Sequence, residues 1–520
     1  MKRLLLPLFC AFLSLSARPE PPTDPTLQPK LIVGVVIDQM REDYLYRFYE
    51  HYSEGGFRRL MRQGMNFTYA HYNYTPTYTG PGHSSIYTGT TPYYHGIISN
   101  DWYDKELKKP VYCAGDTWFK TVGAENESGQ MSPRRLLAST LSDELRMSNN
   151  GLSRVFAASL KDRGSILPGG HMANAAYWYD GKSGNFVTST YYLEKLPGWV
   201  NKFNRRLLPE ALMASDWNLK LPLGAYKTSQ PDDGPGESDP FGEGKTTFPH
   251  LLAQLSVSDK WEAIRSTPFG NQLLTDFAIS LLQEESLGKG NYTDMLAISY
   301  SSTDYVGHAY GPNSMEIMDT YIRMDLEIER LLKALDEAVG TGNYVLFLTA
   351  DHGVKPNADY LNINKMPVGT LSSRAIQDTL RAFCKERYQT PGLIEVVYDN
   401  QVYYNQRAID SLRLDLSEFN NHISRCIRNK FPTIGPIFTQ EGFQGQTAAR
   451  NMQSYALNGT HPYRSGDLSF ELTMNHLGGG YSKGTTHGAS YDYDSHVPLL
   501  FYGWHVPPGE SNEEVYIEDI

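Results

Sequence analysis

Three apolar segments of this chain each run into an acidic residue, and this pattern constrains the fold more than any other feature. The segments lie at residues 31–37, 292–300 and 343–350, and the acidic residues that follow them are Asp38, Asp304 and Asp351. A carboxylate is costly beside a buried strand unless it is paired or bound to a metal ion. Open α/β folds bind ligands at the carboxyl edge of a parallel sheet. We therefore predict an α/β fold whose central, mostly parallel sheet, flanked by helices, carries one shared site at that edge.

Length and charge limit the classes of function. A chain of 520 residues with 40% hydrophobic residues can bury a large core. Its formal net charge of −11 at pH 7 argues against nucleic-acid binding driven by attraction to the phosphate backbone. A small anionic substrate is compatible with that charge, because the local field of a metal site outweighs net charge.

The amino terminus has the pattern of a secretory signal peptide. Lys2 and Arg3 precede a short apolar run, and small residues follow up to Ala17. The run is too short for a spanning helix, so we expect residues 1–17 to be removed, with no membrane anchor. Export places the protein in the periplasm if the source has two membranes. Three cysteines remain, so at most one disulfide is possible, and Cys384 with Cys426 is the pair that we would expect to form it.

The rest of the chain is expected to form one catalytic domain, residues 18–505, with a tail at 506–520. Segments at about 170–290 and 357–475 break the α/β rhythm and are interpreted as inserted caps over the site. The acidic, glycine-rich run at 230–245 is expected to be a solvated loop. Further expected elements are helices at 41–64, 315–339 and 408–429, a short helix from Gly80 or Pro81, strands at 154–163 and 496–503, and a strand-like stretch at 395–405.

Three histidines accompany the acidic residues. Asp304 and His308 are four residues apart, which places both on one face of a helical turn. Asp351 and His352 are adjacent, and we expect Gly353 to permit the sharp turn that they need. His487 lies in the glycine- and threonine-rich sequence GTTHG.

With Asp38, these residues provide three carboxylates and three imidazoles, enough for two zinc ions with open positions. Mg²⁺ or Ca²⁺ would favour oxygen ligands. Mn²⁺, Fe and Co remain alternatives.

A nucleophile and an anion-binding group are also suggested. Thr79 precedes Gly80 at the expected start of a helix, where the free N–H groups and the dipole favour a bound phosphate. Its hydroxyl would need activation, which metal coordination supplies. The alternative is that Thr79 is a simple helix cap.

Lys161 and Arg163 alternate at the end of an expected strand, so both would face one anion. Asn100 could donate a further hydrogen bond to that anion. For each of these three residues the alternative is an ordinary surface position.

At these residues the chain resembles the alkaline phosphatase superfamily, and in particular the secreted bacterial phosphate-irrepressible alkaline phosphatases with a threonine nucleophile. The motifs IDQMREDYL, TPTYTGPGHSSIYTGT, Lys161-x-Arg163, STDYVGH, TADHG and the late His487 occur in that order between about residues 30 and 505.

The resemblance implies an alkaline phosphatase-like fold and hydrolysis of phosphate monoesters, with inorganic phosphate as product and a phosphothreonine intermediate on Thr79. It also implies one zinc ion on Asp304, His308 and His487, and a second on Asp38, Asp351, His352 and the Thr79 oxygen. Asn100, Lys161 and Arg163 would hold the phosphoryl oxygens, with the lysine in place of a third, magnesium site. We expect a monomer.

Two alternatives remain open. Nucleotide pyrophosphatase/phosphodiesterases share Thr79 and Asn100, but their diester substrate carries less charge, and the Lys161-x-Arg163 pair favours a monoester. A secreted binding module with structural zinc is a different class, but structural zinc sites are normally closed and often contain cysteine. Sulfatases require a different nucleophile motif, which TGPGH does not match.

Overall fold

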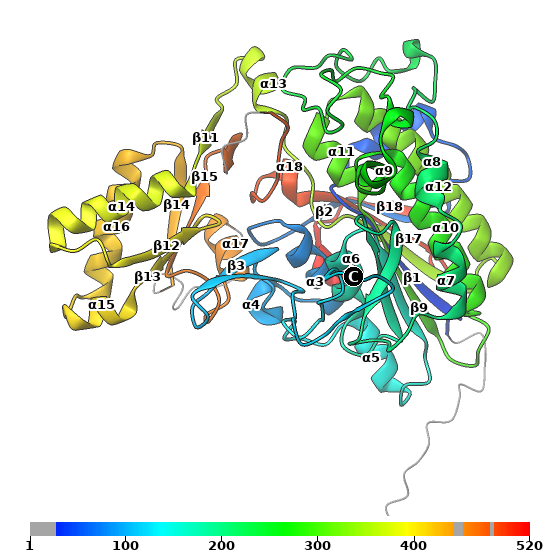
Figure 1. The fold of residues 1–520 in the computed structure, drawn as a ribbon, viewed down its shortest axis with the longest axis horizontal. Helices are drawn as coiled ribbons and strands as arrows, with labels where there is room; N and C mark the ends of the chain where they lie inside the picture. Colours follow the sequence, from blue (N-terminus) through cyan, green and yellow to red (C-terminus); the bar gives the residue numbers. More distant parts are fainter. Residues whose placement is uncertain (1–27, 441–450, 479–482) are drawn as a thin grey trace, which may run out of the picture.

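The computed structural model describes residues 28–440, 451–478 and 483–520. The expected signal peptide at residues 1–17 lies outside these ranges. Figure 1 shows a large α/β body joined to a smaller body that contains α14, α15 and α16.

The large body is built on an eleven-stranded sheet within the described residues. Its central strands β10, β1, β9, β6 and β7 are mutually parallel, and antiparallel strands extend both edges. In spatial order the strands are β18 (Gly509–Ser511), β2 (Met65–His71), β17 (His496–Gly503), β10 (Tyr344–Thr349), β1 (Leu31–Ile37), β9 (Asp294–Tyr300), β6 (Val155–Ser159), β7 (Ala175–Asp180), β8 (Asn185–Ser189) and β5 (Thr121–Val122), with β19 (Val515–Tyr516) paired to β2. The predicted fold class, a mostly parallel sheet flanked by helices, is confirmed.

Two groups of helices flank the sheet. The first consists of α3 (Thr79–Thr88), α5 (Leu141–Ser148) and α6 (Asp162–Gly169), and the second of α10 (Pro268–Glu284), α11 (Ser302–Tyr310) and α12 (Met315–Ala338). The sheet is contacted by α6 from the first group and by α10 from the second. Shorter elements of this body are α1 (Tyr44–Arg47), α2 (Phe57–Gln63), α4 (Pro92–His95), α7 (Gly198–Asn204), α8 (Leu208–Leu212), α9 (Val257–Ala263), α18 (Asp492–Ser495) and the hairpin of β3 (Asp101–Asp104) with β4 (Lys109–Tyr112).

The smaller body has a hydrophobic core of its own, which includes Leu380, Ile423 and Phe470. Its elements are β12 (Ile394–Tyr398), β13 (Gln401–Tyr404), β15 (Leu468–Leu472) and β14 (Ile434–Thr439), with α14 (Ser373–Tyr388), α15 (Gln406–Ser411), α16 (Leu416–Lys430) and α17 (Met452–Asn458). The single helix expected at 408–429 is two helices, and the strand-like stretch at 395–405 is a hairpin. Linking segments contain α13 (Ala358–Ile363) and the pair of β11 (Gly369–Leu371) with β16 (His476–Gly478).

The helix expected at residues 41–64 is wrong in extent, because the chain forms α1, a 3₁₀ turn at Tyr49–His51 and then α2. The side chain of Asp325 accepts hydrogen bonds from the backbone of Ser53 and Phe57, at 2.6 and 2.7 Å. A Cβ atom at Gly56 would lie 2.2 Å from the same carboxylate. A long-range contact from α12 therefore holds the chain in a turn where the local pattern favoured a helix.

The segment at 170–290 is only partly an insertion. Strands β7 and β8 belong to the central sheet, and α10 packs against α12. The run at 230–245 is not simply solvated, since Glu237 is buried and accepts a hydrogen bond from the Gln230 side chain at 2.7 Å. The expected tail at 506–520 contributes β18 and β19, so that segment completes one edge of the sheet.

The expected disulfide is not formed. Cys384 and Cys426 are both free thiols, and they lie in the hydrophobic core of the smaller body. None of the helices within the described ranges is both long and apolar enough to cross a bilayer.

Candidate active site

The three acidic residues meet at the carboxyl edge of the central sheet, as the sequence pattern predicted. Asp38 follows β1, Asp351 follows β10, and Asp304 lies in the first turn of α11 just after β9. Because β10, β1 and β9 are adjacent parallel strands, these carboxylates are neighbours. All three side chains are buried. The Asp38 backbone N–H donates to the Tyr300 carbonyl at 2.9 Å, which joins the two strand ends.

His308, His352 and His487 are oriented by the backbone. Each ring lies with Nδ1 close to a carbonyl oxygen, at 2.8 Å from Thr485 for His308, 2.9 Å from Gly353 for His352 and 2.8 Å from Thr77 for His487. A carbonyl can only accept, so Nδ1 carries the donated proton and Nε2 is the atom left for a metal ion. Gly353 does not have positive φ, and it is needed for another reason: a Cβ there would lie 2.3 Å from the Tyr493 carbonyl oxygen.

The Nε2 atoms face the carboxylates. His308 Nε2 lies 3.1 Å and His487 Nε2 3.8 Å from the same Asp304 oxygen. His352 Nε2 lies 3.5 Å from Asp38 and 3.6 Å from Asp351. Within the described residues, two groups of ligand atoms fall within 4.8 Å of one another: Asp38, Asp351 and His352, and Asp304, His352 and His487. His352 thus belongs to both groups, and His308 adjoins the second through Asp304 and through its ring contact with His487.

Charge and unpaired oxygens make these groups suitable for cations. Of the three buried carboxylates, Asp38 and Asp304 pair with the Lys161 ammonium group, and a buried excess of negative charge is unfavourable without a further cation. Asp38 Oδ1 and Asp351 Oδ2 are buried and have no hydrogen-bond partner among the described residues. Both of these atoms point toward His352 Nε2. The donor set therefore fits metal ions held by oxygen and nitrogen.

The pKa shifts agree with this charge distribution. Burial, reinforced by Asp304 and Asp351, raises the pKa of Asp38 well above its ordinary value. Burial lowers the pKa of His352, and burial with the neighbouring His352 and His308 lowers that of His487. Both imidazoles are therefore neutral, which is the form that binds a metal ion.

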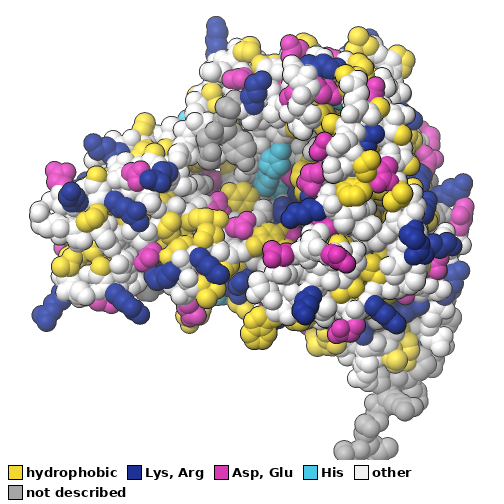
Figure 2. Space-filling view, in the orientation of Figure 1, with side chains coloured by type: hydrophobic (Ala, Val, Ile, Leu, Met, Phe, Trp, Pro, Cys, Tyr) yellow, Lys and Arg dark blue, Asp and Glu magenta, His cyan; other side chains and the backbone are white. Residues whose placement is uncertain are grey.

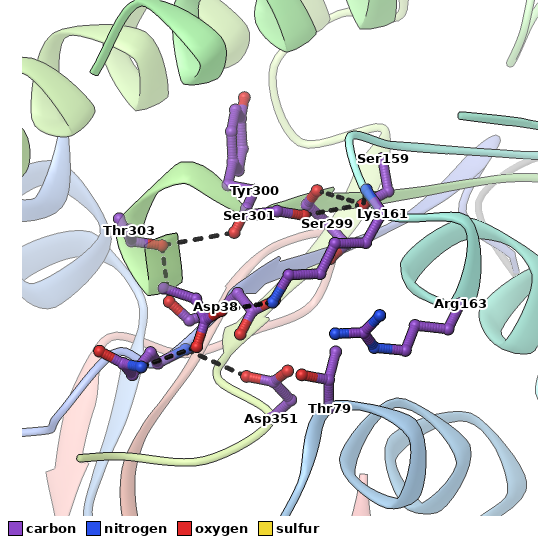
Figure 3. A network of polar contacts seen from close by, with 12 residues as sticks. Asp38, Thr79, Ser159, Lys161, Arg163, Ser299, Tyr300, Ser301, Thr303 and Asp351 are labelled. Carbon is purple, nitrogen blue, oxygen red and sulfur yellow. Dashed lines mark hydrogen bonds and ion pairs between the residues drawn. The ribbon is translucent and has the colours of Figure 1, made fainter. Parts of the chain in front are cut away.

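Lys161 connects the two groups. Its Nζ donates to Asp38 at 2.7 Å (Figure 3) and to Asp304 at 2.6 Å. These two carboxylates raise the pKa of Lys161 despite its burial. The prediction that Lys161 and Arg163 alternate on a strand is wrong. Strand β6 ends at Ser159, Lys161 is the N-cap of α6, and Arg163 lies in the first turn of that helix.

Arg163 reaches the site from α6, and its guanidinium forms no ion pair with a carboxylate among the described residues. Its guanidinium donates to the Tyr112 hydroxyl at 3.1 Å, and its Nε is buried with no hydrogen-bond partner among the described residues. The Tyr112 hydroxyl in turn donates to Asp162. In Figure 3 the Arg163 side chain points toward Thr79. Such a guanidinium is suited to a bound oxyanion.

Thr79 is not a helix cap. It is the first residue of α3, and the N-cap is Tyr78, which makes no side-chain capping bond. The Thr79 hydroxyl lies 3.4 Å from His352 Nε2. Helix α3 approaches the Asp351 loop closely, because a Cβ at Gly82 would lie 2.4 Å from the Asp351 carbonyl oxygen. This contact brings the hydroxyl to the metal-ligand residues.

Asn100 lies beside the same helix start. Its Oδ1 accepts a hydrogen bond from the Gly80 backbone at 2.7 Å, so the NH₂ end of the amide is the part that remains to donate. Both Asn100 and His487 line a cleft of about 340 Å³ between the two bodies. Figure 2 shows histidine side chains at the bottom of this hollow.

The structure adds residues that the sequence reasoning missed. Gln39 donates from its backbone to Asp351 at 3.1 Å and from its side chain to Asp304 at 2.7 Å. His83 lies with Nδ1 2.9 Å from the Thr79 carbonyl and Nε2 2.8 Å from the Ser299 hydroxyl. The spacing of four residues between Thr79 and His83 was a usable signal, whereas the positive φ of Gln39 was not visible in the sequence.

Hydroxyl groups at the strand ends hold the backbone of Lys161 in place. The Ser159 hydroxyl accepts from the Lys161 backbone at 3.1 Å and donates to the Ser299 carbonyl at 2.9 Å (Figure 3). The Thr303 hydroxyl donates to the Asp38 carbonyl at 2.6 Å. These bonds link β1, β6 and β9 at the edge that carries the site.

Known proteins share this architecture. The chain is 43% identical over 505 residues to alkaline phosphatase PhoV of Synechococcus elongatus, covering 95% of this chain and 88% of the relative. It is 40% identical over 500 residues to alkaline phosphatase PafA of Elizabethkingia meningoseptica, covering 96% and 91%. A crystal structure of alkaline phosphatase PafA superposes with a TM-score of 0.89 at 39% identity, covering 95% of this chain and 94% of that one.

A family model described as type I phosphodiesterase / nucleotide pyrophosphatase matches residues 32–470. The match spans the three acidic strand ends, Thr79, Asn100, Lys161 and Arg163, and stops short of His487. The chain belongs to the type I phosphodiesterase / nucleotide pyrophosphatase family, within the alkaline phosphatase superfamily.

Proposed function

We propose that this protein is an exported, zinc-dependent alkaline phosphatase that hydrolyses phosphate monoesters through a phosphothreonine intermediate. The observation that carries the proposal is the meeting of three elements at one sheet edge: a threonine hydroxyl, two groups of metal-ligand residues, and two cationic side chains. Relatives similar over nearly the whole chain are named alkaline phosphatases, which supports the same class of reaction.

Two zinc ions are the cofactors that suit the donor set. Asp304, His308 and His487 would hold one ion, and Asp38, Asp351 and His352, with the Thr79 oxygen, would hold the other. Bound there, the ions would lower the pKa of the Thr79 hydroxyl and neutralise charge on the ester oxygens. The shared position of His352 between the two groups agrees with a compact two-metal site.

The remaining residues position the phosphoryl group. Thr79 supplies the nucleophilic oxygen at the start of α3, where the helix dipole favours an anion. Arg163, in α6, and Asn100, just before β3, would donate hydrogen bonds to phosphoryl oxygens. Lys161, held between Asp38 and Asp304, places a fixed positive charge beside both metal groups, where a third metal ion would otherwise be needed.

The reaction would take place in two steps. The Thr79 oxygen forms a bond to phosphorus as the bond from phosphorus to the ester oxygen breaks, and the alcohol leaves with one proton. A water molecule then attacks the phosphothreonine, which releases inorganic phosphate and restores the Thr79 hydroxyl. Phosphoryl transfer depends mainly on positioning and charge stabilisation, which this arrangement of residues provides.

We also propose where the enzyme acts, on which substrates, and as which oligomer. The apolar segment at residues 1–17 supports export, with a periplasmic location in a double-membrane bacterium. The natural partners are small phosphate monoesters, and the enzyme acts as a monomer. The acidic net charge of −11 argues against nucleic-acid binding.

The ratio of monoester to diester turnover tests the proposal against a phosphodiesterase. We expect kcat/KM for an aryl phosphate to exceed that for the corresponding aryl phosphodiester by roughly 1000-fold, because two cationic side chains meet the additional charge of a monoester. Steady-state kinetics with both esters of one phenol measures this ratio. A preference for the diester would make the protein a phosphodiesterase of the same family.

Replacing either Lys161 or Arg163 with a neutral residue should reduce the ratio of monoester to diester turnover. We expect Arg163→Ala and Lys161→Met to lower kcat/KM for the aryl phosphate by roughly 100-fold, and for the diester by less than about tenfold. Lys202→Ala is the matched control, since Lys202 is exposed in α7 and lines neither the cleft that contains Asn100 nor the cavity lined by Lys161 and Arg163. Equal losses on both esters, or loss of bound zinc, would assign these residues to the fold or the metal groups instead.

A further inference from the structure

The tip of the β12–β13 hairpin, Asp399 and Asn400, reaches from the smaller body into the candidate active site. Tyr398 pairs with Gln401, so the two tip residues form the whole turn. Their φ values are 47° and 58°, the left-handed conformation that a two-residue hairpin turn requires and that Asp and Asn tolerate well. Both residues line the cleft that also contains Asn100 and His487.

The Asp399 carboxylate holds two of the segments that carry residues proposed to contact the phosphoryl group, those of Thr79 and Asn100. One oxygen accepts from the Tyr78 hydroxyl at 2.9 Å, and the other accepts from the Ser99 hydroxyl at 2.6 Å. Tyr78 directly precedes Thr79, and Ser99 directly precedes Asn100. Hydrogen bonds to a carboxylate are stronger than those between neutral groups.

These contacts form part of a closed circuit of hydrogen bonds around the start of α3. Asn100 accepts from the Gly80 backbone at 2.7 Å, so the two segments held by Asp399 also meet each other beside Thr79. The Tyr78 ring packs edge-on against His487, with ring centres 5.5 Å apart. A Cβ at Gly488 would lie 2.5 Å from the Tyr78 ring, so this glycine permits the contact. The circuit thus reaches a metal-ligand residue as well.

The smaller body anchors the tip. Strand β13 pairs with β12 and with β15, and residues of all three strands lie in the core of that body. The position of Asp399 therefore depends on a hydrophobic core that is separate from the one beneath the metal-ligand residues. A displacement of the smaller body would release the Tyr78 and Ser99 hydroxyls together.

We propose that Asp399 is a positioning residue, by which the smaller body sets the places of Thr79 and Asn100 relative to the bound phosphoryl group. Asp399 acts through Tyr78 and Ser99 and does not touch the phosphoryl group itself. The second body is then part of the phosphoryl-binding machinery rather than only a cap over it. This inference rests on the proposed function for its kinetic test, but its binding test does not depend on turnover.

The first test compares two glycine substitutions in one turn. Asp399→Gly removes the carboxylate, and Asn400→Gly removes the neighbouring side chain, while both keep the left-handed backbone without strain. For Asp399→Gly we expect roughly a tenfold loss of kcat/KM on an aryl phosphate, and a similar weakening of inorganic phosphate binding measured by calorimetry. Asn400→Gly should stay within about twofold of wild type in both measurements. Equal behaviour of the two variants would overturn the proposal.

A double-mutant cycle separates positioning from general stability. If the Ser99 bond acts through Asn100, Ser99→Ala should cost roughly fivefold in phosphate affinity in the wild-type background but less than about twofold in the Asn100→Ala background. The same loss in both backgrounds would mean that Ser99 only stabilises the fold. Asp399→Asn, which keeps one acceptor oxygen, should recover part of the affinity, and no recovery would count against the carboxylate contacts.

Failure of the proposed function gives a different result. A wild-type protein that binds inorganic phosphate but does not hydrolyse the aryl phosphate would refute the phosphatase assignment. The Asp399 proposal would still stand in that case if Asp399→Gly weakened phosphate binding and Asn400→Gly did not.

Discussion

Replacement of Thr79 with alanine is expected to lower kcat for an aryl phosphate by at least about 1000-fold, because the variant has no oxygen to accept the phosphoryl group. The fold and the metal content should be retained, since the methyl group of alanine fits the first turn of α3 and the six other ligand residues are unchanged. Steady-state kinetics, metal analysis and thermal unfolding measure these three properties.

The intermediate itself can be detected in the same experiment. Acid quenching during turnover should trap one phosphoryl group per wild-type chain, visible by intact-protein mass, and none on Thr79→Ala. Thr88→Ala is the matched control, because Thr88 lies in the last turn of the same helix and its hydroxyl donates to the Ser84 carbonyl, away from the site. Unchanged activity in Thr79→Ala would refute the assigned nucleophile.

Removal of bound metal is the second change with a large expected effect. We expect a strong chelator to reduce turnover to below about 1%, since the metal ions supply both activation of Thr79 and charge neutralisation. Added Zn²⁺ should restore activity in proportion to a final content of two ions per chain, and Mg²⁺ should not, because the donor set includes three imidazole nitrogens.

The chelated protein should also be less stable. Without metal ions, three buried carboxylates lie close together, and Lys161 forms ion pairs with Asp38 and Asp304 but not with Asp351 among the described residues. Loss of a ligand that binds only the folded state lowers the free energy of unfolding, so the melting temperature should fall on chelation and recover with Zn²⁺. Full activity at a metal content far below one ion per chain would rule out the two-zinc proposal.

Much of the central sheet could be predicted from local patterns. Continuous apolar runs ending in Asp38, Asp304 and Asp351 identified β1, β9 and β10, because strands buried on both faces have a strong sequence signal. The spacing of Asp304 and His308 placed both on one helix face, which α11 confirms. The helix at 41–64 was wrong because Asp325, far away in the sequence, stabilises a turn near Gly56.

The sequence could nominate residues for the candidate site, whose roles stay a prediction, but it could not predict their contacts. The residues nominated as metal ligands are polar residues at strand ends and in motifs, and the structure brings the three carboxylates, the three imidazoles and the Thr79 hydroxyl close together at one edge of the sheet. Lys161 and Arg163 were assigned to a strand, and in the structure the turn from β6 into α6 directs Lys161 between two carboxylates. Gln39 had no recognisable signal, since its role follows from the backbone conformation after β1.

The amino-acid pattern alone was enough to establish an α/β sheet, the edge that carries the site, and the chemical types gathered there. It could do so because hydrophobic periodicity and acidic strand ends are local properties. Which imidazole faces which carboxylate, the bridge that Lys161 forms, and the reach of Asp399 from a second core to Tyr78 and Ser99 depended on the folded chain. Those contacts join residues up to several hundred positions apart, and their geometry follows from packing between elements, which no local pattern encodes.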